Sequence, residues 1–175
     1  MDLRNTIRNV PDFPIKGIQF KDITTLLKDK EALSLAVKQL ALKVKELDFD
    51  FVVSMEARGF IFGSLLAYEL NKGFIPLRKK GKLPAQTISE TYEKEYGLDT
   101  IEMHLDALKK GDKVLIVDDL LATGGTCKAA VNLVEKTGAT VSALAFLIEL
   151  SYLNSRKLFE GYKVISLIDY ESERE

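Results

Sequence analysis

The run from residue 113 to residue 128, KVLIVDDLLATGGTCK, constrains the fold more than any other part of the chain. Residues 114–117 form a short β-branched apolar run, typical of a strand buried on both faces of a parallel sheet. Asp118 and Asp119 follow where that strand would end. A turn rich in glycine and threonine continues to Thr126, and apolar residues then return at helical spacing. The run therefore predicts a strand, an acidic pair, a small-residue turn and a helix.

The turn has the composition of an anion-binding site. Gly124 and Gly125 carry no side chains, so backbone N–H groups there can approach a phosphate closely. Thr123 and Thr126 add hydroxyl donors, and the following helix would point its positive N-terminus at the same place. Ligands of open parallel sheets bind beyond the carboxyl ends of the strands, which is where this turn would lie.

The acidic pair has a different chemical use. Asp118 and Asp119 are poor ligands for phosphate but good acceptors for two sugar hydroxyls, or partners for a hydrated metal ion. The pair and the turn together would hold a ribose with a 5′-phosphate, although the P-loop and the dinucleotide fingerprint do not fit the run. The competing interpretation is an ordinary buried strand with a polar exit and a threonine-capped helix. The combination of two acids with TGGT favours a binding site.

The stretch VLIVDDLLATGGT resembles the phosphoribosyl-pyrophosphate (PRPP) binding motif of the type I phosphoribosyltransferases, and its LLATGGT form is similar to the adenine-specific branch. The resemblance extends over nearly the whole chain. It implies one α/β domain over residues 1–175, with a parallel twisted sheet flanked by helices. An N-terminal helix and hood segment would occupy 1–28, and a flexible hairpin loop 85–103. The alternation of strand and helix patterns also indicates a parallel α/β sheet.

Local patterns predict the individual elements. Apolar residues at helical spacing indicate an amphipathic helix over 29–47, with Leu42 on its apolar face. The other expected elements are helices over 2–9, 60–70 and 151–159, and strands over 49–54, 73–77, 140–150 and 162–169. Residues 85–103 are polar and contain Gly97, which suits the turn of a long hairpin. Such a hairpin can close over a substrate and exclude water.

Composition argues against several classes of function. With 25 basic and 26 acidic residues the net charge is −1, which gives no indication of nucleic-acid binding. No apolar run approaches the roughly 18 residues of a membrane span, and we expect no signal peptide. His104 is the only histidine, which argues against a multi-histidine metal site or a serine-histidine-aspartate triad. The single cysteine, Cys127, fits a cytoplasmic protein and is expected to face the sheet from a helix rather than act as a nucleophile.

The hood segment acquires a function only through the resemblance. Phe20 by itself is equally well explained as a minor core residue or as a flat surface on which a base stacks. The family closes such a segment over adenine, which implies base binding by Gln19, Phe20 and Lys21. Leu121 would cover the other face of the ring, and Arg58 would border it.

A second strand-to-helix turn, EARG at 56–59, resembles the family's pyrophosphate-binding loop, in which a non-proline cis peptide would join Glu56 to Ala57. Arg58 has fork donors that can grip phosphate, although a capping or surface arginine is the alternative. The basic run 78–84, RKKGKLP, is either a solvated loop or a counter-charge for pyrophosphate that can reach the partner subunit's site. The implied pyrophosphate ligands are Glu56, Ala57, Arg58, Gly59, Arg78, Lys79 and Lys82.

The resemblance also implies a reaction: adenine and PRPP give AMP and pyrophosphate, in purine salvage, by a cytoplasmic homodimer. Mg²⁺ would be bound mainly through PRPP and pyrophosphate, with no ligand directly from the protein. Glu95 is the candidate for taking or orienting a proton on the adenine ring, and Tyr96 belongs to the same mobile loop. The implied catalytic residues are Arg58, Glu95, Asp118 and Asp119, and the PRPP ribose and 5′-phosphate ligands are Asp118, Asp119, Ala122, Thr123, Gly124, Gly125 and Thr126.

Two alternative functions stay open at this point. A phosphoribosyltransferase for another nucleobase would share the 114–126 motif but differ around Phe20 and Tyr96. A regulator could keep the fold and bind PRPP without turnover, and would be expected to carry a nucleic-acid-binding extension.

Overall fold

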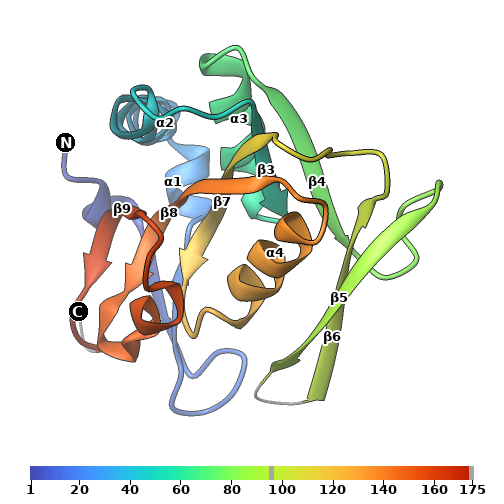
Figure 1. The fold of residues 1–175 in the computed structure, drawn as a ribbon. Coiled ribbons are helices and arrows are strands. Elements are labelled where there is room, and N and C mark those ends of the chain that lie inside the picture. Colours follow the sequence, from blue (N-terminus) through green and yellow to red (C-terminus); the bar gives the residue numbers. More distant parts are fainter. Residues whose placement is uncertain (95–96, 174–175) are drawn as a thin grey trace.

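The computed structural model describes residues 1–94 and 97–173, which form a twisted sheet with helices on both faces (Figure 1). Within this part of the chain the main sheet has seven strands, in the order β5-β6-β4-β3-β7-β8-β9. The strands from β4 to β9 in this order are parallel, and β5 and β6 form an antiparallel edge. Their bounds are β3 Phe51–Met55, β4 Gly73–Lys79, β5 Thr87–Lys94, β6 Gly97–His104, β7 Lys113–Leu121, β8 Thr140–Leu150 and β9 Val164–Tyr170. The predicted α/β class with a parallel sheet is confirmed.

Strand β7 lies in the interior of the sheet, between β3 and β8. Its residues 114–117 have no exposed surface, as the unbroken apolar run predicts. Leu115 and Val117 belong to the core on the face covered by α2 and α3, whereas Val114 and Ile116 belong to the core under α4. The strand therefore delivers the residues that follow it to the middle of the sheet's carboxyl edge.

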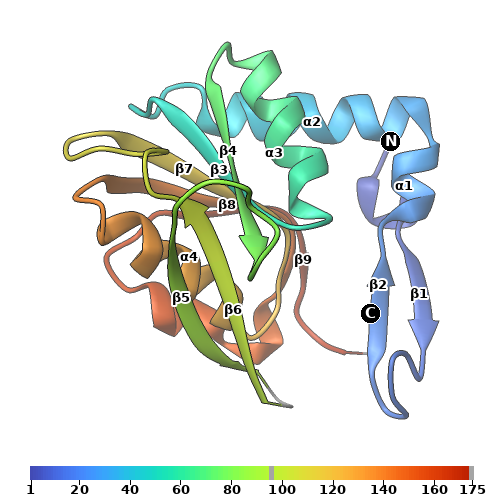
Figure 2. The ribbon, with the colours of Figure 1, turned by 90° about the vertical axis from the view of Figure 1, so that its right-hand side faces the viewer.

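Figure 2 shows that the helices are divided between the two faces of this sheet. Helices α1 (Thr24–Lys28), α2 (Lys30–Val44) and α3 (Gly59–Glu69) lie on one face, and α4 (Gly125–Glu135) lies on the other. No helix among the described residues is long and apolar enough to cross a membrane.

Helix α2 is shorter than the predicted helix over 29–47, and one of its residues faces the other way. It begins after Asp29, whose carboxylate accepts hydrogen bonds from the first N–H groups of the helix. Leu42 was expected on the apolar face but is 62% exposed. The prediction for Leu42 is wrong because the buried stripe of α2 runs through Ala36, Leu40 and Val44, with Leu42 between its turns.

The hood is a separate two-stranded antiparallel ribbon of β1 (Arg8–Pro11) and β2 (Gln19–Asp22). The predicted helix over 2–9 is wrong except for one 3₁₀ turn, η1 (Leu3–Thr6), because the next residues pair with β2 instead. Lys21 is buried with its ammonium group 4.0 Å from the centre of the Tyr170 ring, which joins β2 to the end of β9.

Residues 85–103 form a hairpin, as predicted, but most of this segment is regular strand. β5 and β6 pair from Thr87 opposite His104 to Lys94 opposite Gly97, and β6 joins β4 beside Arg78. Gly97 has a φ of +98°, the left-handed conformation that glycine adopts without steric cost. The mobility of the hairpin stays a prediction.

Residues 151–159 were expected to form one helix and instead form two 3₁₀ helices, η2 (Ser151–Leu153) and η3 (Ser155–Phe159). Asn154 separates them with a φ of 55°. Arg156 donates two hydrogen bonds to the buried carboxylate of Glu149, at 2.6 and 2.7 Å, and Ser166 donates a third at 2.8 Å. Burial raises the pKa of Glu149, but these hydrogen bonds outweigh it and hold that pKa below its ordinary value.

We expect Arg156→Met to lower the free energy of unfolding by about 1–3 kcal/mol at neutral pH, because Glu149 would keep a buried charge without its main partner. The loss should shrink as the pH falls below 4.5, the ordinary pKa of the carboxyl, since protonation removes the charge that Arg156 stabilises. Urea unfolding at several pH values measures this, and the neighbouring exposed Lys157→Met is the control. Equal stability of Arg156→Met and the unmodified protein at pH 7 would contradict it.

Candidate active site

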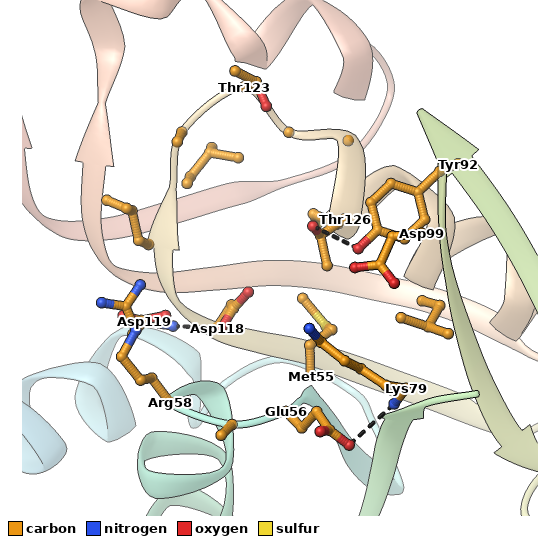
Figure 3. A pocket seen from close by; sticks show the side chains of 18 residues that line it. Met55, Glu56, Arg58, Lys79, Tyr92, Asp99, Asp118, Asp119, Thr123 and Thr126 are labelled. Carbon is orange, nitrogen blue, oxygen red and sulfur yellow. Dashed lines mark hydrogen bonds and ion pairs between the residues drawn. The ribbon is translucent and has the colours of Figure 1, made fainter. Parts of the chain in front are cut away.

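A cavity of about 230 Å³ opens at the carboxyl edge of the parallel strands (Figure 3). This is the edge at which open α/β sheets bind ligands. The cavity is lined by Met55, Glu56, Ala57, Arg58, Lys79, Tyr92, Asp99, Ile101 and every residue from 118 to 127. The structure therefore brings together the acidic pair, the TGGT turn and the EARG turn, which are far apart in the sequence.

The acidic pair lies between the two turns in Figure 3. Asp118 Oδ1 accepts a hydrogen bond from the N–H of Asp119 at 2.9 Å, and the Arg58 guanidinium lies 3.0 Å from Asp119 Oδ2. Burial, and then the charge of Asp119, raise the pKa of Asp118 well above its ordinary value. Burial also raises the pKa of Asp119, against the opposing charge of Arg58. Asp119 Oδ2 is ion-paired with Arg58 but accepts no hydrogen bond within the described residues, so it keeps lone-pair capacity for a ligand hydroxyl.

The TGGT turn has the geometry of an anion cradle at the start of α4. Gly124 precedes the helix with a φ of +87°, whereas Gly125 is already helical. A Cβ at Gly124 would lie 3.1 Å from side-chain atoms of Leu158 and Phe159, so glycine is required there by conformation and by space. The threonine hydroxyl at 126 donates to the Tyr92 phenol at 3.1 Å.

The EARG turn contains the predicted cis peptide between Glu56 and Ala57. Its carboxylate, however, is already occupied: Glu56 accepts hydrogen bonds from Arg78 at 3.0 Å and Lys82 at 2.6 Å, and from the N–H of Lys79 at 3.0 Å. Arg78 and Lys82 were predicted to grip pyrophosphate but are not among the residues that line the cavity, whereas Lys79 is. The reason is an ion pair within the same chain, which draws both cations to Glu56.

Gly59 is needed for the close approach of this turn to the acidic pair. A Cβ at Gly59 would lie 2.5 Å from Asp118 Oδ1, closer than any real contact. A buried hydroxyl reinforces the same junction, because Ser54 of β3 hydrogen-bonds the Gly59 carbonyl at 2.8 Å.

The base-binding candidates on β2 do not line the cavity but reach it through Arg58. The Arg58 guanidinium lies 5.1 Å from the centre of the Phe20 ring, and Phe13 packs edge-on against the same ring. Phe20 is half-buried and belongs to neither hydrophobic cluster, which argues against a core role. The Lys21 side chain is directed to Tyr170, so only its backbone is a candidate for contacting a base. The position of Gln19 beside Phe20 on β2 is likewise compatible with backbone contact.

Leu121 is not on the face shared with the hood. Leu121 is 1% exposed and belongs to the core under α4, whereas Leu120 and Ala122 pack against the core that contains Ile23 beside the hood. Along β7, odd-numbered residues up to Val117 face the core that contains Ile23, whereas even-numbered residues face this core from Leu120 onward. The prediction for Leu121 is corrected to Leu120, because the alternation changes phase at the acidic pair.

Other candidates are settled or lie outside the described residues. Burial, and then the charge of Asp118, raise the pKa of the Cys127 thiol well above its ordinary value, which disfavours the nucleophilic thiolate. Glu95 and Tyr96 lie outside the described residues, and their roles stay predictions.

Sequence reasoning did not single out Tyr92 or Asp99, which line the cavity. For Tyr92 a signal was available: Ile88 and Tyr92 are four residues apart on β5, so their side chains lie on the same face of the strand.

The raised pKa of Asp118 predicts an effect on stability. The Asp118 carboxyl binds its proton more tightly in the folded protein than in the unfolded chain. Ionisation of this carboxyl above its ordinary pKa of 3.8 therefore destabilises the folded protein. We expect Asp118→Asn to raise the free energy of unfolding at pH 8 by roughly 0.5–2 kcal/mol, as relief of strain in active sites commonly does. The gain should disappear as the pH falls toward 3.8. Denaturant unfolding across this range measures it, with exposed Asp106→Asn as control; a loss of stability at every pH would contradict it.

A family profile, related sequences and solved structures all show that the chain is similar to phosphoribosyltransferases. The sequence profile of the family described as phosphoribosyl transferase domain matches residues 24–172. The chain is 61% identical to an adenine phosphoribosyltransferase of Thermosipho africanus, over 96% of this chain and 99% of that one. A crystal structure of adenine phosphoribosyltransferase from Thermoanaerobacter pseudethanolicus superposes with a TM-score of 0.94 at 52% identity, over 96% of this chain and 98% of that one. The Saccharomyces cerevisiae adenine phosphoribosyltransferase, crystallised with adenine and an iminoalditol bisphosphate, superposes with a TM-score of 0.89 at 37% identity, over 94% and 95% of the two chains.

Proposed function

The chain belongs to the adenine phosphoribosyltransferases of the phosphoribosyltransferase family, and from this premise we propose that it transfers phosphoribosyl from PRPP to adenine, giving AMP and pyrophosphate in purine salvage. One observation carries the proposal: a single cavity holds an acidic pair with a phosphate-type turn on each side of it. PRPP has the same order of groups, a ribose between a 5′-phosphate and a pyrophosphate. Transfer to another base, or PRPP binding without turnover, is not favoured, because the similar proteins are adenine enzymes.

In this proposal the acidic pair holds the ribose. Asp118 and Asp119 accept hydrogen bonds from its 2′ and 3′ hydroxyls, and Asp119 Oδ2, which is ion-paired with Arg58 but accepts no hydrogen bond within the described part of the chain, supports this role. As the carbon–oxygen bond to pyrophosphate breaks, the sugar becomes positively charged, and two nearby carboxylates stabilise that charge. Asp118→Asn is therefore expected to gain stability and lose turnover.

The TGGT turn is proposed to hold the 5′-phosphate through Ala122–Thr126 and the N-terminus of α4. The left-handed Gly124 turns the backbone N–H groups inward, and the hydroxyls of Thr123 and Thr126 add donors. Binding energy from this non-reacting phosphate positions the anomeric carbon for attack by adenine.

The leaving pyrophosphate is proposed to bind the backbone at Ala57 and Gly59, with Arg58 and Lys79 as cations in the cavity. Mg²⁺ is proposed to enter with PRPP, held mainly by its oxygens, and its charge would offset that of the leaving group. The donor set fits this, because Mg²⁺ keeps several waters and the two aspartates can accept hydrogen bonds from them. Glu56 orients Arg78 and Lys82, and we propose that the 78–84 run completes the partner's site in a cytoplasmic homodimer.

Adenine is proposed to stack between Phe20 and Leu120, with Arg58 at its edge. The backbone at Gln19 and Lys21 would offer a C=O to the N6 amino group and an N–H to N1. Glu95 is the proposed group for the proton lost from the ring.

The base preference tests this proposal. Hypoxanthine reverses the donor and acceptor at both ring positions, and unpaired polar groups in a buried site cost on the order of 1–3 kcal/mol each. We expect kcat/KM for adenine to exceed that for hypoxanthine by roughly 30-fold to 10⁴-fold. Phe20→Ala should weaken adenine binding, whereas Gln19→Ala should leave the preference intact because the backbone makes the contact. Lys21→Ala should impair adenine use, because it releases β2 from Tyr170. Comparable efficiency with hypoxanthine would mean that the proposed base specificity is wrong.

The phosphate turn gives a second prediction. A Cβ at Gly125 would lie 3.4 Å from the Glu93 carbonyl oxygen, and the branched side chain of Gly125→Val would crowd both the hairpin and the phosphate. We expect PRPP affinity to fall at least about tenfold, as for the loss of one hydrogen bond to a charged group, with little change in adenine affinity. Titration calorimetry with PRPP and Mg²⁺ measures this. Unchanged PRPP affinity would place the 5′-phosphate elsewhere.

A further inference from the structure

The hairpin of β5 and β6 turns one face toward helix α4 and the cavity. Residues directly opposite each other on the two strands share a face, and alternate residues along each strand share it too. Three such pairs follow one another on this face: Ile88 with Met103, Glu90 with Ile101, and Tyr92 with Asp99. The first pair packs in the core under α4, and the third lines the cavity. Glu90 therefore lies where the hairpin passes from the core to the cavity wall.

Two donors at the far end of α4 hold Glu90 in this place. The Asn132 side chain donates to Glu90 Oε1 at 3.0 Å, and the Lys136 ammonium group pairs with the other carboxylate oxygen. Lys136 also donates to the backbone carbonyl of Ser89 at 3.4 Å. The hydrogen bonds to the carboxylate, that from Lys136 first, lower the pKa of Glu90 below its ordinary value. Glu90, Asn132 and Lys136 thus form a clasp between the strand and the helix.

The clasp lies outside the cavity but is tied to the TGGT turn by the helix. Its three residues, all in the described part of the chain, are not among those that line the cavity. Asn132 and Lys136 follow Gly125, the first residue of α4, by about two and three helical turns. The hairpin also meets the TGGT turn itself, where a Cβ at Gly125 would lie 3.4 Å from the Glu93 carbonyl oxygen. One helix therefore sets the distance between the TGGT turn and the anchor of the hairpin.

The chemistry of the clasp fixes a position rather than adding attraction. Hydrophobic contact, such as that of Ile88 with the core, is non-directional and tolerates a shift of the strand along the helix. Hydrogen bonds are directional, so a carboxylate that accepts from two donors one helical turn apart is satisfied in a single register. A well-packed apolar side chain in place of a largely buried ion pair is often at least as stabilising. Placement of the hairpin therefore explains the clasp better than stability does.

We infer that Glu90 is a positioning residue for phosphoribosyl transfer, which sets through Asn132 and Lys136 where along α4 the hairpin lies. This inference rests on the proposed function and adds to it a control that acts from outside the cavity. The TGGT turn would hold the substrate at one end of α4, and the clasp at the other end would hold the hairpin's part of the cavity wall at the matching height. A displacement of about 1 Å in such a wall can cost roughly 100-fold in rate.

Steady-state kinetics with PRPP, adenine and Mg²⁺ test the clasp. We expect Glu90→Ala and Lys136→Ala each to lower kcat/KM for PRPP by roughly 10-fold to 100-fold. Lys136→Arg should keep most of the activity, because it retains the cation and its donors. The double variant Glu90→Ala with Lys136→Ala should be no worse than the weaker single variant, because one substitution already opens the clasp.

Two comparisons separate positioning from folding. Glu93→Ala is the matched control, because it removes the same charge from the opposite face of the same strand and should leave kcat/KM unchanged. Lys136 is 54% exposed, so its truncation leaves the core under α4 intact, and thermal melting should show a folded protein at the assay temperature. In hydrogen exchange of the protein without ligand, the β5 amides should exchange faster in Lys136→Ala than in the unmodified protein, whereas the α2 amides should not change.

A kcat/KM in Glu90→Ala equal to that of Glu93→Ala would overturn the inference, and so would losses that simply add in the double variant. If the unmodified protein formed no AMP from PRPP and adenine, the proposed function would be wrong instead. The hydrogen-exchange comparison would then still show whether Lys136 holds β5 on the helix, because it needs no substrate.

Discussion

The site depends on one unfavourable arrangement, two adjacent carboxylates at the end of a strand that is buried on both faces. Burial raises the pKa values of both Asp118 and Asp119, and the charge of Asp119 raises the pKa of Asp118 further. Arg58 compensates the pair only in part, from 3.0 Å, and Gly59 keeps its Cβ-less backbone against Asp118. A ligand with two neighbouring hydroxyls can complete the hydrogen bonding of this pair, so the destabilisation that we predict for these carboxylates and their proposed affinity for ribose have the same origin.

The parts around this pair are held by contacts outside the cavity. Arg156 and Glu149 anchor the 3₁₀ segment η3, whose Phe159 packs where a Cβ of Gly124 would lie. Tyr170 holds the hood strand through Lys21, more than a hundred residues away in sequence. Remote substitutions at such anchors can therefore change ligand binding without touching a ligand, because they move the backbone that makes the contacts.

The positions of some residues in the site can be predicted from the sequence and those of others cannot, for reasons that the structure shows. The buried strand at 114–117, the TGGT turn and the hairpin at 85–103 are recoverable because each depends on a local pattern. The resemblance implies Leu121 at the base, and nothing in a Leu-Leu pair reveals that the alternation along β7 changes phase at the acidic pair and places Leu120 on that face. The sequence likewise does not show that Glu56 accepts hydrogen bonds from Arg78 and Lys82, because this contact joins separate segments of the chain.

The sequence by itself therefore determined the α/β class, the central strand and the residues that end it, because hydrophobic burial and glycine conformation act over a few neighbouring positions. Only the tertiary structure decided which of those residues face the same space. It turned Leu120 rather than Leu121 toward the hood, drew Arg78 and Lys82 to Glu56, and placed Tyr92 over the start of α4. Such choices depend on the register between strands and on ion pairs between distant segments, and these exist only when the segments have been brought together.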